Sequence, residues 1–451
     1  MSNIDKFLYL FYLLCLPFGQ FIRIFPENFT LPIAFSTLIM MFALFKIILN
    51  HGIKQSAGVQ SFGRLYLFMA GYSILASIIL TFTLDYGLKE PPIRRCLGGI
   101  VLYFLLLCSI YYNWYCLSRL KSFKVIKNVF QLQTIVLLFV GFLQLGVMSG
   151  VGVGLYSALC SIFVLRDVVY LTTLDRGITF FASEPSLTSS LCFVVIPFIL
   201  FSISNNKGKK KLIYVIEFLL MAILFLLSNS SSALISFLFV CVAYIVLYVF
   251  HLRLKKLVMF GAFAIGAIVA VLYSLDISTS NKISSDTNSF EYVVLGKVLD
   301  KDNMSTAMRA STVINDMKIF YDYPLTGVGD GNQGYYYAQN IPAWVLPSSE
   351  VQNLLHGSKL SNGGGNFFPC YLSAFGLVGI IVFLSFLRKY RQSYRQSFLR
   401  QSRNFEIIYV LGISLLLLGT WYIVDIKADN TAAFLLSLPC VMMKKRKINE
   451  I

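Results

Sequence analysis

Residues 65–83 read LYLFMAGYSILASIILTFT, a stretch without a charged side chain. A helix needs about 20 mainly apolar residues to cross a bilayer, and a helix satisfies its own backbone hydrogen bonds there. Eleven further runs of comparable length are separated by polar or charged breaks: 6–24, 31–49, 97–115, 129–148, 187–204, 212–227, 233–250, 257–275, 367–387, 405–424 and 430–443. The sequence therefore predicts an all-α polytopic membrane protein with about 12 transmembrane helices.

The composition of the 451 residues favours a membrane protein and excludes other classes. Hydrophobic residues make up 57% of the chain and charged residues only 13%, about half the charged share of a soluble domain. Intrinsic disorder requires low hydrophobicity, which the 40 Phe and 26 Tyr exclude. The formal net charge of +17 would indicate a nucleic-acid partner only if the basic residues formed one solvated patch. Their dispersal gives no reason to expect nucleic-acid binding.

The distribution of Lys and Arg predicts the orientation in the membrane. With a cytoplasmic N-terminus, 25 of the 38 basic residues fall in cytoplasmic segments. Six of the other 13 lie in one long loop, residues 276–365, and long loops cross the membrane largely regardless of charge. Both termini are thus expected in the cytoplasm and the long loop outside. The first run lacks a small-residue cleavage site, so a retained helix is expected and not a signal peptide.

The predicted helices divide the chain into three parts. Residues 1–275 carry helices one to nine with an outer segment at about 149–186, residues 276–366 form the large outer loop, and residues 367–451 carry the last three helices and a basic cytoplasmic tail. Apolar spacings of mostly three and four predict an amphipathic helix over residues 303–323 of the loop. The following TGVGDGNQG, residues 326–334, is expected to form a tight turn, because a phosphate loop needs a preceding strand and a following Lys.

Five arginines on the predicted outer side are candidates for contact with an anionic ligand: Arg94, Arg95, Arg166, Arg176 and Arg309. The guanidinium group presents a planar fork of donors that suits phosphate, and a departing pyrophosphate requires its charge to be neutralised. Ion pairing with neighbouring acids such as Glu90, Asp167 and Asp175 is the alternative role. The nine cysteines show no C-x-x-C spacing, so neither a zinc site nor a disulfide framework is expected.

Three stretches resemble the superfamily of O-antigen polymerases and ligases. Residues 176–186, RGITFFASEPS, resemble the R-G-x-F-x-E-P-S segment of Wzy-type O-antigen polymerases, and Arg166 stands in an arginine-x10-glycine spacing to Gly177. Arg309, the predicted loop helix and YPLTGVGDG at residues 323–331 are similar to the superfamily's core of an arginine, a helix and P-x-x-G-x-G-x-G. Residues 366–379 resemble its entry into the helix after the large loop.

Two departures from the superfamily pattern bear on the activity. Residues 227–233, LSNSSSA, contain no arginine where members often have Ser-Arg, so a charge role at this turn is not expected. Gly365 stands where ligases typically have a histidine beside the Asn of the post-loop helix. The outer histidine, His356, lies further upstream. This second departure favours a polymerase over a ligase.

The resemblance implies an inverting, metal-independent glycosyltransferase of GT-C-like architecture, working without a cofactor in the bacterial inner membrane. It would join undecaprenyl-pyrophosphate-linked oligosaccharide units on the periplasmic side, and its partners would be these lipid-linked glycans, membrane lipid and a chain-length regulator protein. The residues expected to hold the pyrophosphate are Arg166, Arg176 and Arg309, with Arg94 and Arg95 as lesser candidates. Glu184 and His356 are the candidates for the general base, which would take the proton of the acceptor hydroxyl.

Three alternatives stay open at this stage. An O-antigen ligase would transfer the glycan to lipid A core, and a capsule or enterobacterial-type polymerase would perform the same chemistry on another glycan. A flippase or transporter of lipid-linked oligosaccharide belongs to a different class. Transporters usually show internal repeats and charges near the middle of the membrane, whereas the sequence shows no repeat and Glu217 lies near the inner end of its run.

Overall fold

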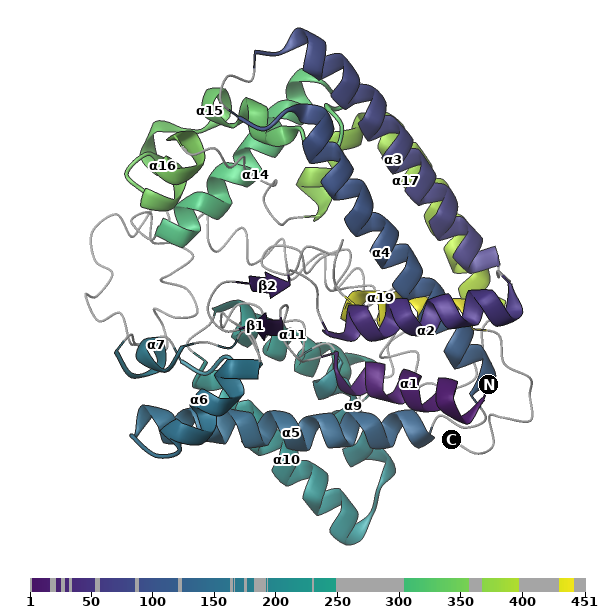
Figure 1. The fold of residues 1–451 in the computed structure, drawn as a ribbon, viewed down its shortest axis with the longest axis vertical. Coiled ribbons are helices and arrows are strands. Elements are labelled where there is room, and N and C mark those ends of the chain that lie inside the picture. The colour runs from purple at the N-terminus through teal and green to yellow at the C-terminus, as the bar shows by residue number, and fades with distance from the viewer. Residues whose placement is uncertain are drawn as a thin grey trace.

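A computed structural model gives the fold of the chain, shown in Figure 1. The residues that the structure describes are 2–16, 22–25, 29–31, 35–52, 57–85, 89–120, 124–162, 165, 167–173, 177–181, 192, 194–228, 231–248, 304–356, 367–396 and 430–441. The predicted helices at 257–275 and 405–424 lie outside these residues, so they remain predictions.

Helices account for most of the described residues. The α-helices are α1 (Asn3–Leu14), α2 (Phe35–His51), α3 (Ala57–Thr83), α4 (Pro92–Arg119), α5 (Lys124–Met148), α6 (Val153–Ile162), α7 (Val168–Thr173), α9 (Val195–Asn205), α10 (Gly208–Leu226), α11 (Ser231–Tyr248), α14 (Met304–Asp322), α15 (Tyr337–Asn340), α16 (Ser349–His356), α17 (Phe367–Gln396) and α19 (Asn430–Ser437). The 3-10 helices are η3 (Gln333–Tyr336), η4 (Ala343–Val345) and η8 (Leu438–Cys440).

Four of the described helices are long and apolar enough to cross a membrane. They lie within α3, α4, α5 and α17, over Ala57–Thr83, Pro92–Arg119, Val125–Met148 and Pro369–Gln392. Each contains most or all of a predicted run, at 65–83, 97–115, 129–148 and 367–387 respectively. The protein is therefore a membrane-embedded helical protein. The expectation of about 12 transmembrane helices goes further than these four helices and stays a prediction.

The N-terminal segment differs from its prediction. Helix α1 ends at Leu14, and the expected single helix over 6–24 gives way to a hairpin of β1 (Ile22–Phe25) and β2 (Phe29–Leu31). The strands pair antiparallel, with an irregularity in register between Arg23 and Phe25. The sequence explains the change, because Pro17 cannot continue an α-helix and the β-branched residues that follow favour a strand.

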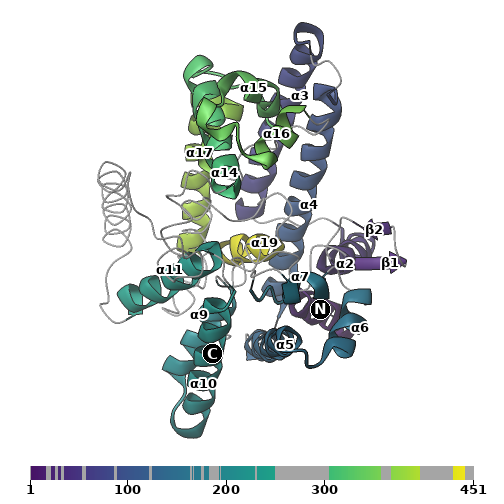
Figure 2. The same cartoon turned by 90° about the vertical axis from the view of Figure 1, so that its left-hand side faces the viewer.

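Helices α3, α4 and α17 lie side by side, and α14, α15 and α16 pack against one end of them in both Figure 1 and Figure 2. Aromatic side chains join α3 to α17, since the ring of Phe375 lies 5.8 Å from the rings of both Phe68 and Tyr72. Tyr371 extends this contact, with its ring 4.9 Å from that of Phe375. The loop helix α14 thus rests on the same end of the bundle as the connection between α3 and α4.

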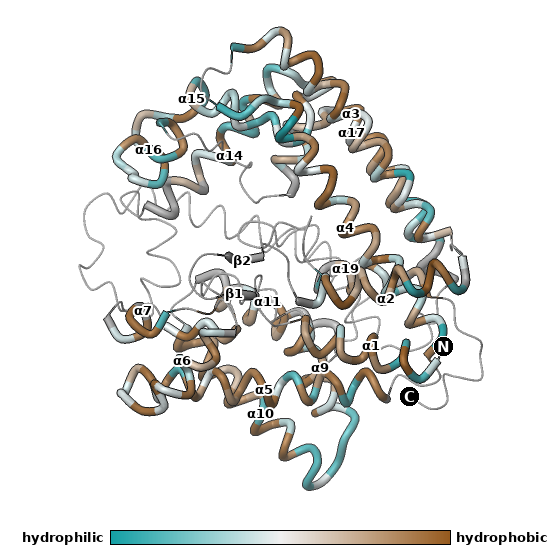
Figure 3. The backbone as a smooth tube through the Cα atoms, viewed as in Figure 1, coloured by the Kyte–Doolittle hydropathy of each residue, from teal (hydrophilic) through white to brown (hydrophobic). Residues whose placement is uncertain are grey.

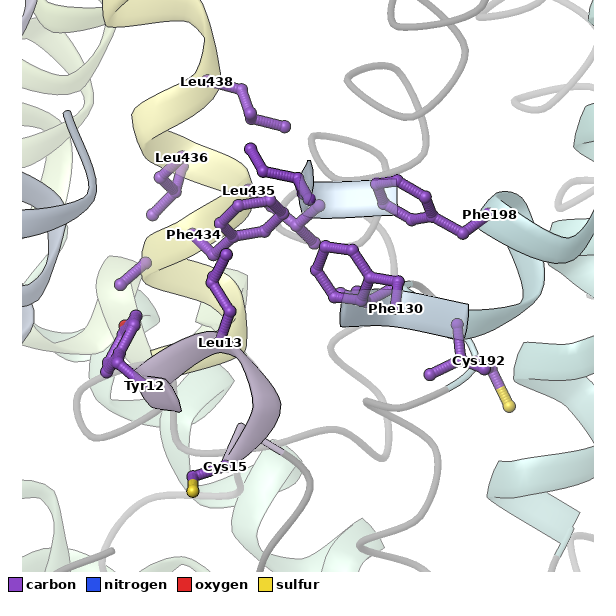
Figure 4. Close-up of a cluster of buried hydrophobic side chains, with 14 of the residues drawn as sticks. Tyr12, Leu13, Cys15, Phe130, Cys192, Phe198, Phe434, Leu435, Leu436 and Leu438 are labelled. Carbon is purple, nitrogen blue, oxygen red and sulfur yellow. The ribbon is translucent and has the colours of Figure 1, made fainter. Parts of the chain in front are cut away.

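A second group of helices surrounds α5, which packs against α1, α9 and α10. In Figure 2, α5 is seen almost end-on while α3, α4 and α17 stand upright. The four candidate spans therefore do not form one parallel bundle. Figure 4 shows the core of this second group, where the ring of Phe130 stacks on Phe198 at 4.2 Å and lies 5.5 Å from Phe434 of α19.

The long helices are largely apolar along their length, as the coloured backbone of Figure 3 shows for α3 and α5. On α3, Leu75, Ile79 and Phe82 follow one another at helical spacing and are 64%, 62% and 85% exposed. Exposed large apolar side chains in a contiguous row mark contact with lipid or with another protein. Their position on a helix long enough to span a bilayer agrees with lipid contact.

Candidate functional site

The glycine-rich segment between α14 and η3 forms the tight turn that the sequence predicts. Gly327, Gly329 and Gly331 all have positive φ angles, of 63°, 82° and 89°. Only glycine adopts this conformation without a steric cost, so the alternating glycines determine the path of the chain. The turn begins where the backbone N–H of Gly327 donates to the carbonyl of Tyr323 at 2.8 Å, just after α14 ends.

This turn packs against a break in α17 and supplies hydrogen-bond partners to the backbone there. At Gly376 the helix is kinked, with φ 56° and ψ −154°. In a continuous helix the N–H groups of Leu377 and Val378 would donate to the carbonyls of Ser373 and Ala374. Instead, these two N–H groups donate to the carbonyls of the turn at positions 324 and 325, at 2.8 and 3.2 Å. The carbonyls of Ser373 and Ala374 accept from the N–H groups of the turn at positions 328 and 329, at 2.9 and 2.8 Å.

The exchange leaves all four backbone groups of the kink paired within an apolar helix. Unpaired backbone groups are costly in hydrocarbon and in a protein interior, which is why irregular backbone in a span is found only where protein or water covers it. The contact is close, because a Cβ on Gly376 would lie 2.5 Å from the carbonyl carbon of Leu325. The turn and the break in α17 therefore form one structural unit.

The other side of the turn is bonded to α3. The hydroxyl of Tyr72 donates to the carbonyl of Thr326 at 2.6 Å, and the backbone N–H of Asp330 donates to the hydroxyl of Ser73 at 3.0 Å. One turn further along α3, Ser77 accepts from the side-chain amide of Asn332 at 3.0 Å. Three polar side chains of α3, at positions 72, 73 and 77, thus hold the turn in place.

A network of buried polar side chains lies beneath the turn. The side-chain amide of Asn315 donates to the carbonyl of Gln333 at 3.1 Å and its oxygen accepts from Asn340 at 3.0 Å. Ser373 donates to a carboxylate oxygen of Asp316 at 3.3 Å. All five of these residues are buried, which ties α14, η3, α15 and α17 into one unit through specific hydrogen bonds.

The first turn of α4 brings two of the predicted arginines to this unit, in different environments. Arg94 is exposed, and its Nε lies 3.1 Å from a carboxylate oxygen of Glu90. Arg95 is half-buried against the turn, since a Cβ on Gly331 would lie 3.6 Å from the Cγ of Arg95. The hydroxyl of Tyr335 donates to the carbonyl of Glu90, which binds η3 to the residues just before α4.

The pKa values of neighbouring groups follow from burial. Burial lowers the pKa of Lys89, and the positive charge of Arg95 lowers it further. Burial raises the pKa of Tyr336, and the neighbouring Tyr323 adds to the increase through its charge and a hydrogen bond. This end of the bundle is therefore partly shielded from water although it lies at a chain reversal between two long helices.

The other predicted site residues are placed as follows. Arg309 lies on α14, seven residues before Asp316, so the two positions share one face of the helix. His356 is the last residue of α16 and is exposed. Arg166, Arg176 and Glu184 lie outside the described residues. The structure thus brings Arg95 to the turn, places Arg309 on the helix that leads into it, and gives His356 a separate position.

The segment that directly follows Arg176 is described, and it has a tightly determined path. The N–H of Ile178 donates to the carbonyl of Leu227 at 3.3 Å, and a Cβ on Gly177 would lie 1.8 Å from that carbonyl oxygen. The side chain of Gln144 accepts from the N–H groups of Thr179 and Phe180 at 3.0 and 2.9 Å. Glycine is thus required at position 177, where the chain crosses the end of α10.

Several residues of the site were not singled out from the sequence. Asp330 lies inside the quoted glycine motif, but a carboxylate between two glycines suggests a turn more readily than a site residue. Asp316, Asn315 and Gln333 share no pattern that marks them as buried. Asn315 and Asp316 lie within the predicted loop helix and Gln333 within the glycine-rich motif, and neither pattern distinguishes these positions from their polar neighbours. Within the described part of the chain, no three His, Cys, Asp or Glu side chains come together as a possible metal site.

Comparison with known families gives one match. Residues 216–384 match the Wzy_C family, which is described as O-antigen ligase. The matched stretch runs from α10 to α17 and includes α14, the turn and the kink. It is consistent with the superfamily of O-antigen polymerases and ligases that the sequence motifs indicate. No curated protein sequence matches the chain.

Proposed function

We propose that this protein is an O-antigen polymerase, a membrane glycosyltransferase that joins undecaprenyl-pyrophosphate-linked oligosaccharide repeat units. The observation that carries the proposal is the match of residues 216–384 to the O-antigen ligase family. The polymerase motifs quoted above add residues 166–186, which lie before the matched stretch. The helices of the matched stretch include the loop helix with Arg309 and the turn that packs against Arg95.

The proposed reaction is an inverting displacement. An acceptor sugar hydroxyl attacks the anomeric carbon of the donor glycan, the bond from that carbon to the pyrophosphate oxygen breaks, and undecaprenyl pyrophosphate leaves. Arg166, Arg176 and Arg309, with Arg94 and Arg95, neutralise the charge that develops on the leaving group. The proton of the acceptor hydroxyl passes to a general base, for which Glu184 and His356 are the candidates.

The proposed setting is the periplasmic face of a bacterial inner membrane, with both termini in the cytoplasm. This orientation rests on the excess of Lys and Arg in the predicted cytoplasmic segments. Lipid-linked pyrophosphate lies at the depth of the headgroups, where arginines at helix ends can reach it. A chain-length regulator protein is the proposed partner, and membrane lipid surrounds the helices.

A ligase is the second candidate, and the description of the matched family favours it. It would use the same donor but transfer the glycan to lipid A core. Gly365, in the position where ligases have a histidine, supports the polymerase instead. Deletion of the gene followed by a lipopolysaccharide gel separates the two. A polymerase deletion leaves lipid A core capped with single units, whereas a ligase deletion leaves no units attached.

The identity of the base is tested by two substitutions in the full-length protein. His356→Ala should abolish chain extension if the imidazole takes the proton, and Glu184→Gln should do so if the carboxylate does. A His356→Ala variant with full activity excludes the histidine. The exposed Gln339→Ala, in the same loop, serves as a control and should leave chain extension unchanged.

A further inference from the structure

Asp330 is an ionisable residue of the turn to which the proposed reaction assigns no role. Only 5% of its surface is exposed, although it stands between two glycines in a connection between helices. A buried carboxylate is costly unless it is hydrogen-bonded or near a positive charge. Its burial at this position therefore requires a physical explanation.

The position of Asp330 is fixed by the turn from both sides. Its backbone N–H donates to Ser73 of α3, and the preceding Gly329 donates to the carbonyl of Ala374 at the kink of α17. There is no room for a side chain at Gly329, because a Cβ there would lie 2.6 Å from the Cβ of Ala76. Two long helices thus set the backbone of Asp330.

The side chain of Asp330 lies over the first turns of α4. A Cβ on Gly99 would lie 3.4 Å from a carboxylate oxygen of Asp330, so the carboxylate lies directly over Gly99. Gly99 is one helical turn beyond Arg95, which places both on one face of α4. The charge of Arg95 is opposed by its burial and favoured by its Coulombic interactions with Tyr335, Glu90 and Asp330, in that order.

Arg94 and Arg95 are adjacent in sequence but differ in how far the surrounding protein confines their side chains. The Gly331 backbone packs against the side chain of Arg95, whereas Arg94 points to solvent and pairs with Glu90. An exposed arginine with a mobile side chain loses conformational entropy when it binds a ligand. An arginine already confined by packing loses less, and a carboxylate beside its guanidinium would confine it further.

We propose that Asp330 is a positioning residue for Arg95, which it holds so that the guanidinium contacts the pyrophosphate of the lipid-linked donor; this inference rests on the proposed function. The guanidinium has five N–H donors, and a carboxylate occupies at most two of them. The others remain for phosphate oxygens. The kink at Gly376 and the glycines of the turn serve to bring Asp330 to α4.

The experiment is a double-substitution cycle in the full-length protein, reconstituted in vesicles. Asp330→Asn keeps the backbone N–H and the size of the side chain and removes its charge, and Arg95→Gln removes the guanidinium. Binding of undecaprenyl pyrophosphate and the kinetics of chain extension are measured for each single variant and for the double variant. Asp322→Asn changes an exposed acid of α14 and is the matched control. The midpoint of thermal unfolding confirms that each variant is folded.

Asp330→Asn should weaken undecaprenyl pyrophosphate binding about tenfold and raise KM for the lipid-linked donor by a similar factor, because the negative charge that orients Arg95 is lost. The kcat value should fall as well, because Arg95 neutralises charge that develops on the leaving group as the bond breaks. In the Arg95→Gln background, Asp330→Asn should have no further effect, and Asp322→Asn should match the wild type throughout. An effect of Asp330→Asn that is equal in both backgrounds, or absent in both, overturns the positioning role.

Results that contradict the proposed function can be told apart from results that contradict the positioning role of Asp330. A wild-type protein that binds undecaprenyl pyrophosphate but transfers glycan to lipid A core contradicts the polymerase, while the cycle of binding constants still decides the role of Asp330. A wild-type protein that binds no undecaprenyl pyrophosphate overturns both claims. Normal chain extension with an additive cycle overturns the positioning role alone.

Discussion

Gly327 and Gly376 lie on two segments that exchange backbone hydrogen bonds, and both adopt the left-handed conformation, with φ angles of 63° and 56°. A Cβ on Gly327 would lie 2.4 Å from the carbonyl oxygen of Ser373, and one on Gly376 would lie 2.5 Å from the carbonyl carbon of Leu325. The loop before α17 and a helix long enough to span a membrane therefore meet at two positions that only glycine fills.

The close contact between the two segments predicts that a methyl group at position 376 destabilises the folded protein. Gly376→Ala should lower the free energy of unfolding by more than the roughly 1–2 kcal/mol that an unfavourable backbone conformation alone costs, because the methyl group would also clash with the carbonyl of Leu325. The measurement is the midpoint of thermal unfolding in detergent. Gly71→Ala, where a Cβ meets nothing within 4 Å, is the matched control in α3 and should not lower the midpoint. An unchanged midpoint for Gly376→Ala would show that the kink is not required.

A second prediction concerns Gly177, where the chain crosses the end of α10. Gly177→Ala should displace the backbone, because the methyl group would lie 1.8 Å from the carbonyl oxygen of Leu227. The hydrogen bonds from Thr179 and Phe180 to Gln144 should weaken, and hydrogen exchange of these amides should become faster. Gly154→Ala, in open space on α6, should leave the exchange unchanged. Equal exchange in wild type and Gly177→Ala contradicts the tight crossing.

The third prediction tests a candidate residue for pyrophosphate contact. Arg309→Ala should abolish chain extension while the protein remains in the membrane, because the charge of the leaving group is then less well neutralised. Lys318→Ala removes an exposed positive charge from the same helix and should leave chain extension intact. Polymer lengths on a lipopolysaccharide gel measure both. Normal lengths in Arg309→Ala would refute the assigned role.

The fourth prediction concerns pH and the N-terminal helix. Burial opposes the ionisation of Asp5, but hydrogen bonds from Lys46 and Ser2 and the charge of Lys46 outweigh it and lower the pKa of Asp5. The lysine Nζ lies 2.9 Å from the carboxylate. Because the folded value is the lower one, this stabilisation is fully present above the usual aspartate value of about 4 and is lost as the pH falls through the folded value.

The measurement compares the thermal unfolding of wild type and Asp5→Asn between about pH 3 and pH 7. The wild type should be more stable at neutral pH by about 1 kcal/mol, and the difference should shrink at the acidic end. Asp322→Asn, which changes an exposed acid, should leave the midpoint unchanged. A difference for Asp5→Asn that does not depend on pH would contradict the role of this ion pair.

The parts of the fold that depend on local patterns could be predicted from the sequence. The apolar run at residues 65–83 lies within α3, and the periodic residues of 303–323 form α14 almost to the residue. The predicted run over residues 6–24 is longer than α1, because Pro17 and the β-branched residues after it are as apolar as a helix requires but do not favour one. The proposed site residues Arg166, Arg176 and Glu184 lie outside the described residues and stay predictions.

The kink and the site could not be predicted in the same way, because they depend on contacts between distant segments. Gly376 lies in an apolar run that reads as a continuous helix, and the hydrogen-bond partners that allow its break come from residues 324–329. Asp330 is one acid among several in the loop before α17 until the fold brings it against Ser73 and Gly99 and near Arg95. Spacing along one segment does not contain this information.

The most direct test of the polymerase is reconstitution of the full-length protein in vesicles with undecaprenyl-pyrophosphate-linked repeat units as both donor and acceptor. The account predicts lipid-linked products of two and more units, together with release of undecaprenyl pyrophosphate. Transfer of the glycan only when lipid A core is supplied, or movement of intact lipid-linked units across the membrane without new glycosidic bonds, would contradict it.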